Sequence, residues 1–579
     1  MTASSRTPYL VGKAFRSFLL ASVLTAAASQ VGALIDGLML SRFINEEAMS
    51  AINITSPVTQ ALFALCILIG VGGSMLAGIA IGNHRKDEAS GIFSVVITTA
   101  ISLGIVLGIA GMVFLTPLLH LLCPDASLQG YTSQYLVVIL PASAIYMLMV
   151  VAQMFVTLDG EPRRVTAAVT TCMVVNLTLD YIFIVWCGWA MTGAAIATVI
   201  SYLGSLCVLF PHFLKKEALR YTLPRTIRQL GRIASMGLPF GIATVLIAVQ
   251  MLGNNLVAIN YLGAAGIVTL SICMYLLRFS MIILTGTLES FQPVAAILKG
   301  SGDNHGVALV LGRAYRFLAV SLSVLALILI IFPGWIADLF GIDDAASMAM
   351  LHVALPAYAV NIILQCAVYL LIPVYQIYSH KNMALIISFG QPLMPMVCYW
   401  LLSAAVGAGY AWINPWWGFA IGQLVVVLIL APFALTRKGD HKPFVLIPTD
   451  NPDELFDISV TPAIDRMEDA IVEADEWMRT QSLPEQLRLR VGLACEESIK
   501  NIIQHALGKK AQHSAIDMRI ALSADKVTAV IRDEGTPFNP VEQDPGTGLG
   551  LMLVRKTCDD QKYEYLFHQN ILTIEWQRK

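Results

Sequence analysis

The hydrophobic pattern divides this chain into two parts. Up to about residue 435, apolar stretches follow one another with short polar breaks, and most reach the roughly 20 residues that a helix needs to cross a bilayer. The predicted spans lie near residues 15–40, 57–81, 92–120, 134–158, 165–187, 190–212, 234–261, 266–297, 312–338, 349–377, 382–406 and 415–435. From about residue 455 onward the pattern changes to that of a soluble α/β domain.

The twelve spans form two sets of six around a basic polar connection at residues 215–232. This arrangement is typical of transporters built from two repeated halves. We therefore expect an all-α polytopic membrane domain of twelve transmembrane helices in a 6+6 repeat. Its lobes are predicted at residues 1–214 and 233–437, and a polar linker at 438–454 leads to a further domain at 455–579.

Composition and charge support a membrane protein with a soluble extension. The chain is 56% hydrophobic and only 13% charged, whereas soluble domains are nearer a quarter charged. A net charge of -2 with no dominant basic face argues against nucleic acid as a partner. The cysteines are scattered, mostly in apolar stretches, and show no metal-binding spacing, so we interpret them as core residues.

Loop charges predict the orientation of the chain. Lysine and arginine in short loops stay on the cytoplasmic side, and here they follow the even-numbered spans, for example at Arg85/Lys86, Arg163/Arg164 and Lys381. The first apolar run lacks a small-residue cleavage site and is interpreted as a spanning helix. We therefore predict a multi-pass protein of the cytoplasmic (inner) membrane, surrounded by lipid, with both termini cytoplasmic.

A few ionisable residues lie deep inside the predicted spans. A charge at the bilayer centre costs about 2.5–3.5 kcal/mol on insertion scales, so each such residue is a functional candidate. They are Asp36, Asp180, Arg278 and Glu289, and Asn176 shares a helix face with Asp180. A buried carboxyl group can bind a proton or a bare cation, which suits ion coupling. The alternative is that these acids only pair with polar groups between helices.

Several segments resemble multidrug and toxic compound extrusion (MATE) transporters. In the first half they are VGALIDGLMLSRFINEEAMSAINITSPV, GVGGSMLAGIAIGNHRKDEA and LDGEPRRVTAAVTTCMVVNLTLDYIFIV, and in the second half SFQPVAAILKGSGDNHGVALVLGRAY. The resemblance covers about residues 10–435. It implies a two-lobed, twelve-helix exporter of organic cations or other amphipaths that exchanges them for H⁺ or Na⁺. It also implies that Asp36, Asn176 and Asp180 form the ion-coupling site of the first lobe.

The second lobe departs from this pattern in its first helix. Where some family members have an acid, this chain has the neutral residues Gln250, Asn254 and Asn255. The remaining candidates for substrate or ion contacts in this lobe are Glu289, Gln292 and Asn254.

The C-terminal domain carries three ordered motifs. Strands are predicted near 455–460, 514–522, 525–532, 562–567 and 571–576, with helices near 464–480, 484–507 and 549–558. Glu497 and Asn501 lie one helical turn apart, a pair suited to holding Mg²⁺ and polarising a hydroxyl group near a phosphate. Asp533 ends a strand, Gly535 opens the following turn, and the loop GTGLG at 546–550 allows backbone N–H groups to approach phosphate.

Together these motifs resemble the ATPase fold shared by histidine kinases and gyrase, and most closely the anti-sigma-factor serine kinases. The resemblance spans about residues 455–579, including the ending NILTIEW. It implies ATP and Mg²⁺ as cofactors, Glu497 as general base, Asn501 as the Mg²⁺ ligand and Asp533 as the reader of the adenine amino group. It further implies that four glycines shape the pocket, namely Gly535, Gly546, Gly548 and Gly550.

Two other ATP-dependent mechanisms are disfavoured by the sequence. No phosphoacceptor-histidine helix precedes the domain, and His505 is interpreted as structural, which argues against a histidine autokinase. No G-x-x-x-x-G-K-[ST] loop occurs, which argues against direct ATP-driven transport.

The leading hypothesis is an ion-coupled secondary exporter of small amphipathic or cationic compounds that is regulated by, or signals through, its ATP-binding domain. Whether that domain is a serine kinase acting on a cytoplasmic protein, an ATPase or a sensor stays open at this point. The main alternative is a membrane-anchored serine kinase or anti-sigma-like regulator whose helical domain acts as a sensor. A lipid-linked precursor flippase would need a basic cavity, for which Arg278 is the sole candidate found.

Overall fold

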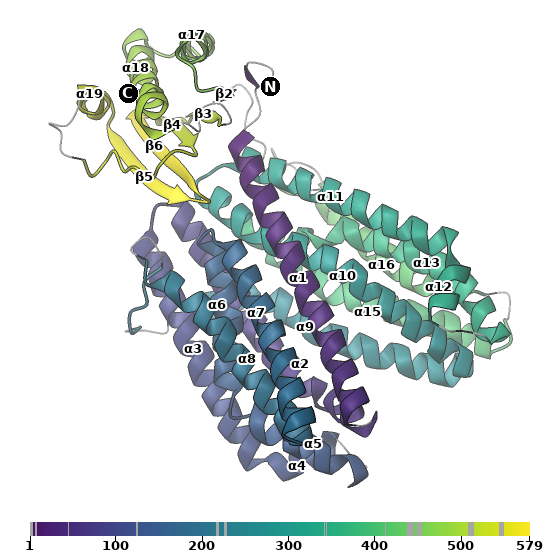
Figure 1. Cartoon of the computed structure of the whole chain (residues 1–579). Helices are drawn as coiled ribbons and strands as arrows, with labels where there is room; N and C mark the ends of the chain where they lie inside the picture. Colours follow the sequence, from purple (N-terminus) through teal and green to yellow (C-terminus); the bar gives the residue numbers. More distant parts are fainter. Residues whose placement is uncertain are drawn as a thin grey trace. The chain divides into compact units, whose positions relative to one another are not determined.

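The computed structural model contains two compact units (Figure 1). The helical unit comprises Phe18–Gly302 and Leu311–Ile447, and the sheet unit comprises Met1–Ser17, Asp303–Val310 and Pro448–Lys579. The structure describes residues 4–578 apart from 6–8, 45, 123–125, 216–218, 225–227, 341, 343, 411–412, 437–444, 449–453, 508–513 and 544–548.

Every predicted span falls on a described helix or on a pair of helices. The first half has α1 (Tyr9–Phe43), α2 (Glu46–Gly82), α3 (Lys86–Val113), α4 (Leu115–Leu122), α5 (Ala126–Ile139), α6 (Ser143–Leu158), α7 (Pro162–Asp180) and α8 (Ala190–Phe213). The second half has α9 (Leu230–Val257), α10 (Gly263–Gly300), α11 (Asn304–Ile331), α12 (Pro333–Leu339), α13 (Ala345–Tyr369), α14 (Leu371–Ile377), α15 (Lys381–Gly407) and α16 (Trp417–Thr436).

Ten of the described helices are long and apolar enough to cross a membrane, or eleven if the bent pair α5 and α6 is one span. The predicted all-α polytopic fold is thus confirmed. The residues Trp417–Pro432 of α16 form a shorter apolar helix. α5 and α6 meet at a bend of 61° around Pro141, because proline cannot continue the helical hydrogen-bond ladder.

The two halves of the helical unit approach closely where glycines remove side chains. A Cβ added at Gly237 of α9 would overlap the carbonyl oxygen of Leu68 on α2. At the end of α2, a Cβ on Gly82 would overlap the carbonyl oxygen of Ile297 on α10, and one on Gly300 would overlap that of Ile79. Side chains at these positions would therefore push α2 away from the second half.

The sheet unit contains a six-stranded antiparallel sheet in the order β1-β2-β3-β4-β6-β5. Its strands are β1 (Ser4–Ser5), β2 (Leu455–Val460), β3 (Ile516–Leu522), β4 (Lys526–Asp533), β5 (Asp560–Leu566) and β6 (Gln569–Gln577). Its C-terminal helices are α17 (Ile464–Thr480), α18 (Glu485–Asn501) and α19 (Leu549–Thr557). The α/β architecture predicted for residues 455–579 is confirmed, and β1 is an additional edge strand from the N-terminus.

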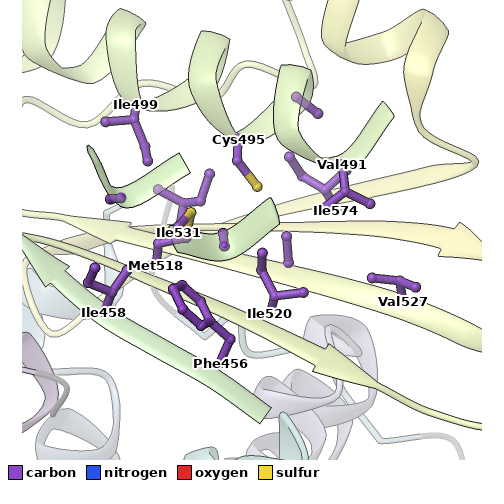
Figure 2. Close-up of a cluster of buried hydrophobic side chains, with 14 of the residues drawn as sticks. Phe456, Ile458, Val491, Cys495, Ile499, Met518, Ile520, Val527, Ile531 and Ile574 are labelled. Atoms are coloured by element: carbon purple, nitrogen blue, oxygen red, sulfur yellow. The ribbon is translucent and has the colours of Figure 1, made fainter. Parts of the chain in front are cut away.

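Alternate residues of the strands build an apolar core with the helices (Figure 2). Phe456 and Ile458 of β2 and Ile531 of β4 lie against Val491 and Cys495 of α18, and all five are at most 5% exposed. This face of the sheet, called the core face below, is covered by α17 and α18. The intervening residues point to the opposite face, called the polar face below.

Candidate functional site

Asp36 and Asp180 meet in the first half of the helical unit. Asp36 lies on α1, and Asp180 is the last residue of α7, where six residues of π-helix begin (η1, Tyr181–Trp186). Such π-helical turns are frequent at functional sites because they change the direction of side chains. The two carboxyl groups lie close enough to interact with each other, and Tyr135 interacts with both.

The described surroundings of this acid pair supply few hydrogen bonds to its carboxyl groups. Asp180 is fully buried, and among the described residues its two carboxylate oxygens have no hydrogen-bond partner other than the carboxyl group of Asp36. Asn176, one turn earlier, donates from Nδ2 to Oγ1 of Thr198 over 3.4 Å. The structure therefore places all three residues predicted for the coupling site on the adjoining helices α1 and α7. Buried carboxylates without partners are expected to bind a cation or a proton.

Small and polar residues set the approach of α1 to α7. The hydroxyl groups of Thr25 and Thr166 lie 2.8 Å apart, and Thr166 also donates to the backbone oxygen of Ala21. Further along, a Cβ on Gly32 would lie 3.1 Å from Cγ of Met173. Small residues let helix backbones come close within a membrane. The contacts between α1 and α7 at Thr25 and Gly32 precede Asp36 along α1.

The second half presents its polar groups mainly as amides. Asn254 of α9 and Gln292 of α10 are 1% and 7% exposed, and Oδ1 of Asn254 and Nε2 of Gln292 have no hydrogen-bond partner among the described residues. Glu289 of α10 is exposed and lies near Tyr369 of α13. Arg278, also exposed, places its guanidinium 5.9 Å from the ring centre of Tyr275. This half therefore lacks a carboxyl pair like that of the first among the described residues.

Glu497 and Asn501 form one wall of a second site, in the sheet unit. Both lie on α18, which passes into a π-helical turn (η4, Ile502–Ala506) directly after Asn501. Gly550, near the start of α19, faces them: an added Cβ would lie 2.6 Å from Oε2 of Glu497 and 3.3 Å from Nδ2 of Asn501. Nδ2 of Asn501 is buried without a partner among the described residues. A side chain at Gly550 would therefore displace the carboxylate of Glu497.

Asp533 forms the floor of this site at the end of β4. The side chain is 3% exposed, and its Oδ1 accepts hydrogen bonds from Gly535 N at 2.7 Å and from Asn570 Nδ2 at 2.8 Å. Burial raises the pKa of Asp533, while these two hydrogen bonds act to lower it. Oδ1 is therefore committed to the protein, which leaves Oδ2 as the acceptor available to a ligand.

The turn after Asp533 is fixed against the end of η4. A Cβ on Gly535 would lie 2.6 Å from Cβ of Ala506, and Thr536 N donates to Ala506 O over 3.0 Å. Gly546 and Gly548 lie outside the described residues. The segment before them is held by Arg555 of α19, whose guanidinium donates to three backbone oxygens, those of Pro540, Val541 and Gln543.

Three residues that support this site were not predicted from the sequence, namely Asn570, Tyr563 and Arg555. Asn570 lies directly opposite Asp533 in the β4–β6 register and also accepts a hydrogen bond from the Tyr563 hydroxyl at 2.6 Å. The segment NILTIEW was noted, but its first residue was given no role, because pairing across strands is invisible without the register. Arg555 gave no signal beyond its place in a helix.

These residues fit a nucleotide with a divalent cation. Among the described residues, Nδ2 of Asn501 has no hydrogen-bond partner, and the hydrogen bonds of the Asp533 carboxylate go to Oδ1. Gly550 leaves the Glu497 carboxylate uncovered on its side. Glu497 and Asn501 are the residues that would lie nearest the cation and phosphates, and Asp533 the one nearest the base. ATP bound there would supply a transferable γ-phosphoryl group.

Comparisons with known proteins agree with this division of the chain. Residues 21–182 match the MatE family model, and residues 460–576 match that of the histidine kinase-like ATPase domain. The multidrug export protein MepA of Staphylococcus haemolyticus is 25% identical over 288 residues, which are 49% of this chain and 64% of MepA. MepA of Staphylococcus saprophyticus is 27% identical over 260 residues, 44% of this chain and 57% of MepA. The chain thus covers less than two thirds of either relative.

Solved structures share the fold of the helical part. A MOP superfamily transporter from Pyrococcus furiosus superposes with a TM-score of 0.64 at 21% identity, over 72% of this chain and 94% of that one. The MATE transporter VcmN of Vibrio cholerae gives a TM-score of 0.65 at 18% identity, over 72% and 95%. The chain is therefore a multi-pass membrane protein in which residues 21–182 match the MatE family model and residues 460–576 match the model of the histidine kinase-like ATPase domain.

Proposed function

We propose that this chain is an ion-coupled exporter of small amphipathic or cationic compounds, and that its ATP-binding domain regulates it. The observation that carries the proposal is the pair Asp36 and Asp180, because Asp180 is fully buried and, among the described residues, its oxygens have no partner other than the carboxyl group of Asp36. The substrate class is supported by the MepA relatives, which are known as multidrug export proteins.

Coupling follows from the electrostatics of two neighbouring carboxyl groups. Two carboxylates in a low-dielectric interior repel each other, and a bound H⁺ or Na⁺ removes that repulsion. Entry of the ion from one side and its release to the other would then drive the helices α1 and α7 between two arrangements. Substrate would leave during the half of the cycle in which the ion enters.

Neutralising one acid tests the coupling. In proteoliposomes that carry a fluorescent cationic dye, Asp180→Asn should lower the initial rate of efflux driven by an H⁺ or Na⁺ gradient at least tenfold. The reason is that an amide cannot take up a proton or supply charge to a cation. The matched control is Asp338→Asn, an exposed acid at the end of α12, which should leave the rate unchanged. Gradient-driven efflux at the wild-type rate in Asp180→Asn would refute the coupling role.

The location follows from the loop charges. We propose that the chain lies in the cytoplasmic (inner) membrane, in contact with lipid, with both termini in the cytoplasm. There the C-terminal domain would meet ATP and Mg²⁺.

The main alternative, a serine kinase with a sensing helical domain, is favoured by the arrangement of Glu497, Asn501 and Gly550. In that reaction the γ-phosphoryl group passes from ATP to a serine hydroxyl of a cytoplasmic protein, leaving ADP and phosphoserine. Glu497 would accept the hydroxyl proton, and Asn501 would hold Mg²⁺.

Phosphoryl transfer can be measured directly with the purified full-length protein, a cell extract and ATP labelled at the γ-phosphate. If the domain is a kinase, one extract protein becomes labelled, and Glu497→Ala lowers the labelling rate at least tenfold because the base is lost. Glu496→Ala, one residue away on the same helix, is the matched control and should retain the rate. Nucleotide binding without any transfer of label would instead assign the domain a regulatory role alone.

A further inference from the structure

The polar face of the sheet carries charged side chains that are deeply buried. Because side chains alternate along a strand, Asp457 of β2, Arg519 of β3 and Arg532 of β4 point away from the core face. The side chains of Arg519 and Arg532 are each 6% exposed. Arginine is almost never this buried without a partner. The groups that pair with these arginines therefore show what this face binds.

One partner is Asp303, the residue just before α11. It forms ion pairs with Arg519 and with Arg532, the latter over 3.1 Å between Oδ2 and Nη2. Arg519 in turn binds Asp457 through two hydrogen bonds of 2.6 and 2.8 Å. These four residues are called the Asp303 ion cluster below. Burial acts to raise the pKa of Asp303, but the two guanidinium groups outweigh it and lower the pKa to about 2.

Asp303 also serves the helix that follows it. Its Oδ1 accepts a hydrogen bond from Gly306 N over 2.6 Å, which caps the start of α11. Three residues earlier, Gly300 ends α10 in close contact with α2. The Asp303 ion cluster thus fixes the start of α11 on the polar face of the sheet.

A second partner is the beginning of α1. Lys13 Nζ lies 2.5 Å from Oε2 of Glu534, and the backbone of Leu10 donates to Asp517 Oδ2 over 2.8 Å and accepts from Gln569 Nε2 over 3.1 Å. Upstream of it, β1 pairs with β2 at the edge of the sheet. α1 continues without a proline to Asp36, about 35 Å further along the helix.

The nucleotide site and both anchors share three consecutive residues. Arg532 binds Asp303 at the start of α11, Asp533 has its free oxygen in the nucleotide site, and Glu534 binds Lys13 of α1. A movement of the turn at Asp533 on nucleotide binding would therefore act on both helices at once.

We propose that the polar face is the docking surface for the starts of α1 and α11, and that it couples nucleotide occupancy to the conformation of the helical unit. The inference rests on the proposed regulation of the exporter by its ATP-binding domain. It goes further in naming the coupling contacts, Lys13–Glu534 on α1 and the Asp303 ion cluster on α11. By linkage, any nucleotide effect on the helical unit is matched by an equal effect of that unit on nucleotide affinity.

The test uses the full-length protein in proteoliposomes with a non-hydrolysable ATP analogue and Mg²⁺. The readout is the alkylation rate of Cys187, an exposed residue just after η1, resolved from other cysteines by peptide mass spectrometry. In the wild type, the analogue should change this rate about fivefold or more, within the usual range of coupling between sites. Glu534→Lys should abolish the response, and the exchange Lys13→Glu/Glu534→Lys should restore it, because the ion pair is re-formed with opposite polarity.

A matched control is the exposed pair Lys562–Asp560 on β5, 3.1 Å apart, whose exchange should leave the response intact. Asp303→Asn tests the second anchor independently and should also weaken the response. Analogue binding is measured in every variant, so that a loss of affinity is not mistaken for a loss of coupling. No response in a wild type that binds the analogue, or an undiminished response in Glu534→Lys, would overturn the inference.

Failure of the proposed function would look different. Cys187 alkylation does not depend on transport, so a nucleotide response without gradient-driven dye efflux would support the coupling and reject the exporter. Gradient-driven dye efflux without a nucleotide response would support the exporter and reject the coupling.

Discussion

Asp533→Asn should weaken ATP binding by the full-length protein roughly 100-fold while leaving GTP binding unchanged or stronger. Oδ1 of Asp533 is held by Gly535 N and Asn570 Nδ2, so the amide nitrogen of asparagine would take the place of Oδ2. An N–H donor would then face the amino group of adenine, itself a donor, and a mismatched buried polar pair costs about 1–3 kcal/mol or more. Guanine presents an oxygen at the same position and accepts the new donor.

Equilibrium binding of fluorescent ATP and GTP analogues measures this change in preference. Asp525→Asn, in the turn before β4, is the control and should alter neither affinity. A second signature is the pH dependence of the affinity for ATP. Since burial raises the pKa of Asp533, wild-type ATP affinity should fall on acidification at a higher pH than an ordinary aspartate would give, and Asp533→Asn should lack this titration. Equal losses for ATP and GTP would contradict a base-reading role.

The sequence predicted the elements of both domains because their patterns are local. The apolar spans need only length and composition, and the strands and helices of residues 455–579 need only alternation and helical periodicity. The motif residues Glu497, Asn501 and Asp533 were found because spacing along one helix or at one strand end is visible in the sequence. Asp36 and Asp180 were found because ionisable residues are rare in membrane spans.

Contacts between distant segments could not be predicted in this way. Lys13 and Glu534 lie 521 residues apart, and Asp303 and Arg532 lie 229 apart. In the sequence, Lys13 is an ordinary basic residue before a membrane span, and Asp303 an ordinary acid in a turn between helices. Their role depends on the strand register that places Arg519 and Arg532 on the polar face. A buried arginine on a soluble strand gives no signal without that register.

Arg519→Met should destabilise the sheet unit by roughly 3–5 kcal/mol, because it strands the buried carboxylate of Asp457 and leaves Asp303 with Arg532 as its only arginine partner among the described residues. Hydrogen exchange in the full-length protein measures this locally. Amides of β2 and β3 should exchange roughly 100-fold or more faster, since about 1.4 kcal/mol corresponds to a factor of ten. Lys562→Met breaks an exposed ion pair on β5 and should change these rates less than about threefold.

Two further measurements distinguish buried charge from lost packing as the cause of the destabilisation in Arg519→Met. The double variant Asp457→Leu/Arg519→Met should be more stable than Arg519→Met alone, because the stranded carboxylate is removed.

Acid should also narrow the gap in free energy of unfolding between the wild type and Arg519→Met. In the wild type the pKa of Asp303 is about 2, below its value in the unfolded chain, so its contribution is complete above pH ~4 and is lost as the pH falls toward 2. In the variant, Asp303 keeps only Arg532 of its two arginine partners and takes up a proton at higher pH than in the wild type, which relieves its burial cost. A gap that stays constant between pH 7 and 4 would assign the destabilisation to packing instead of charge.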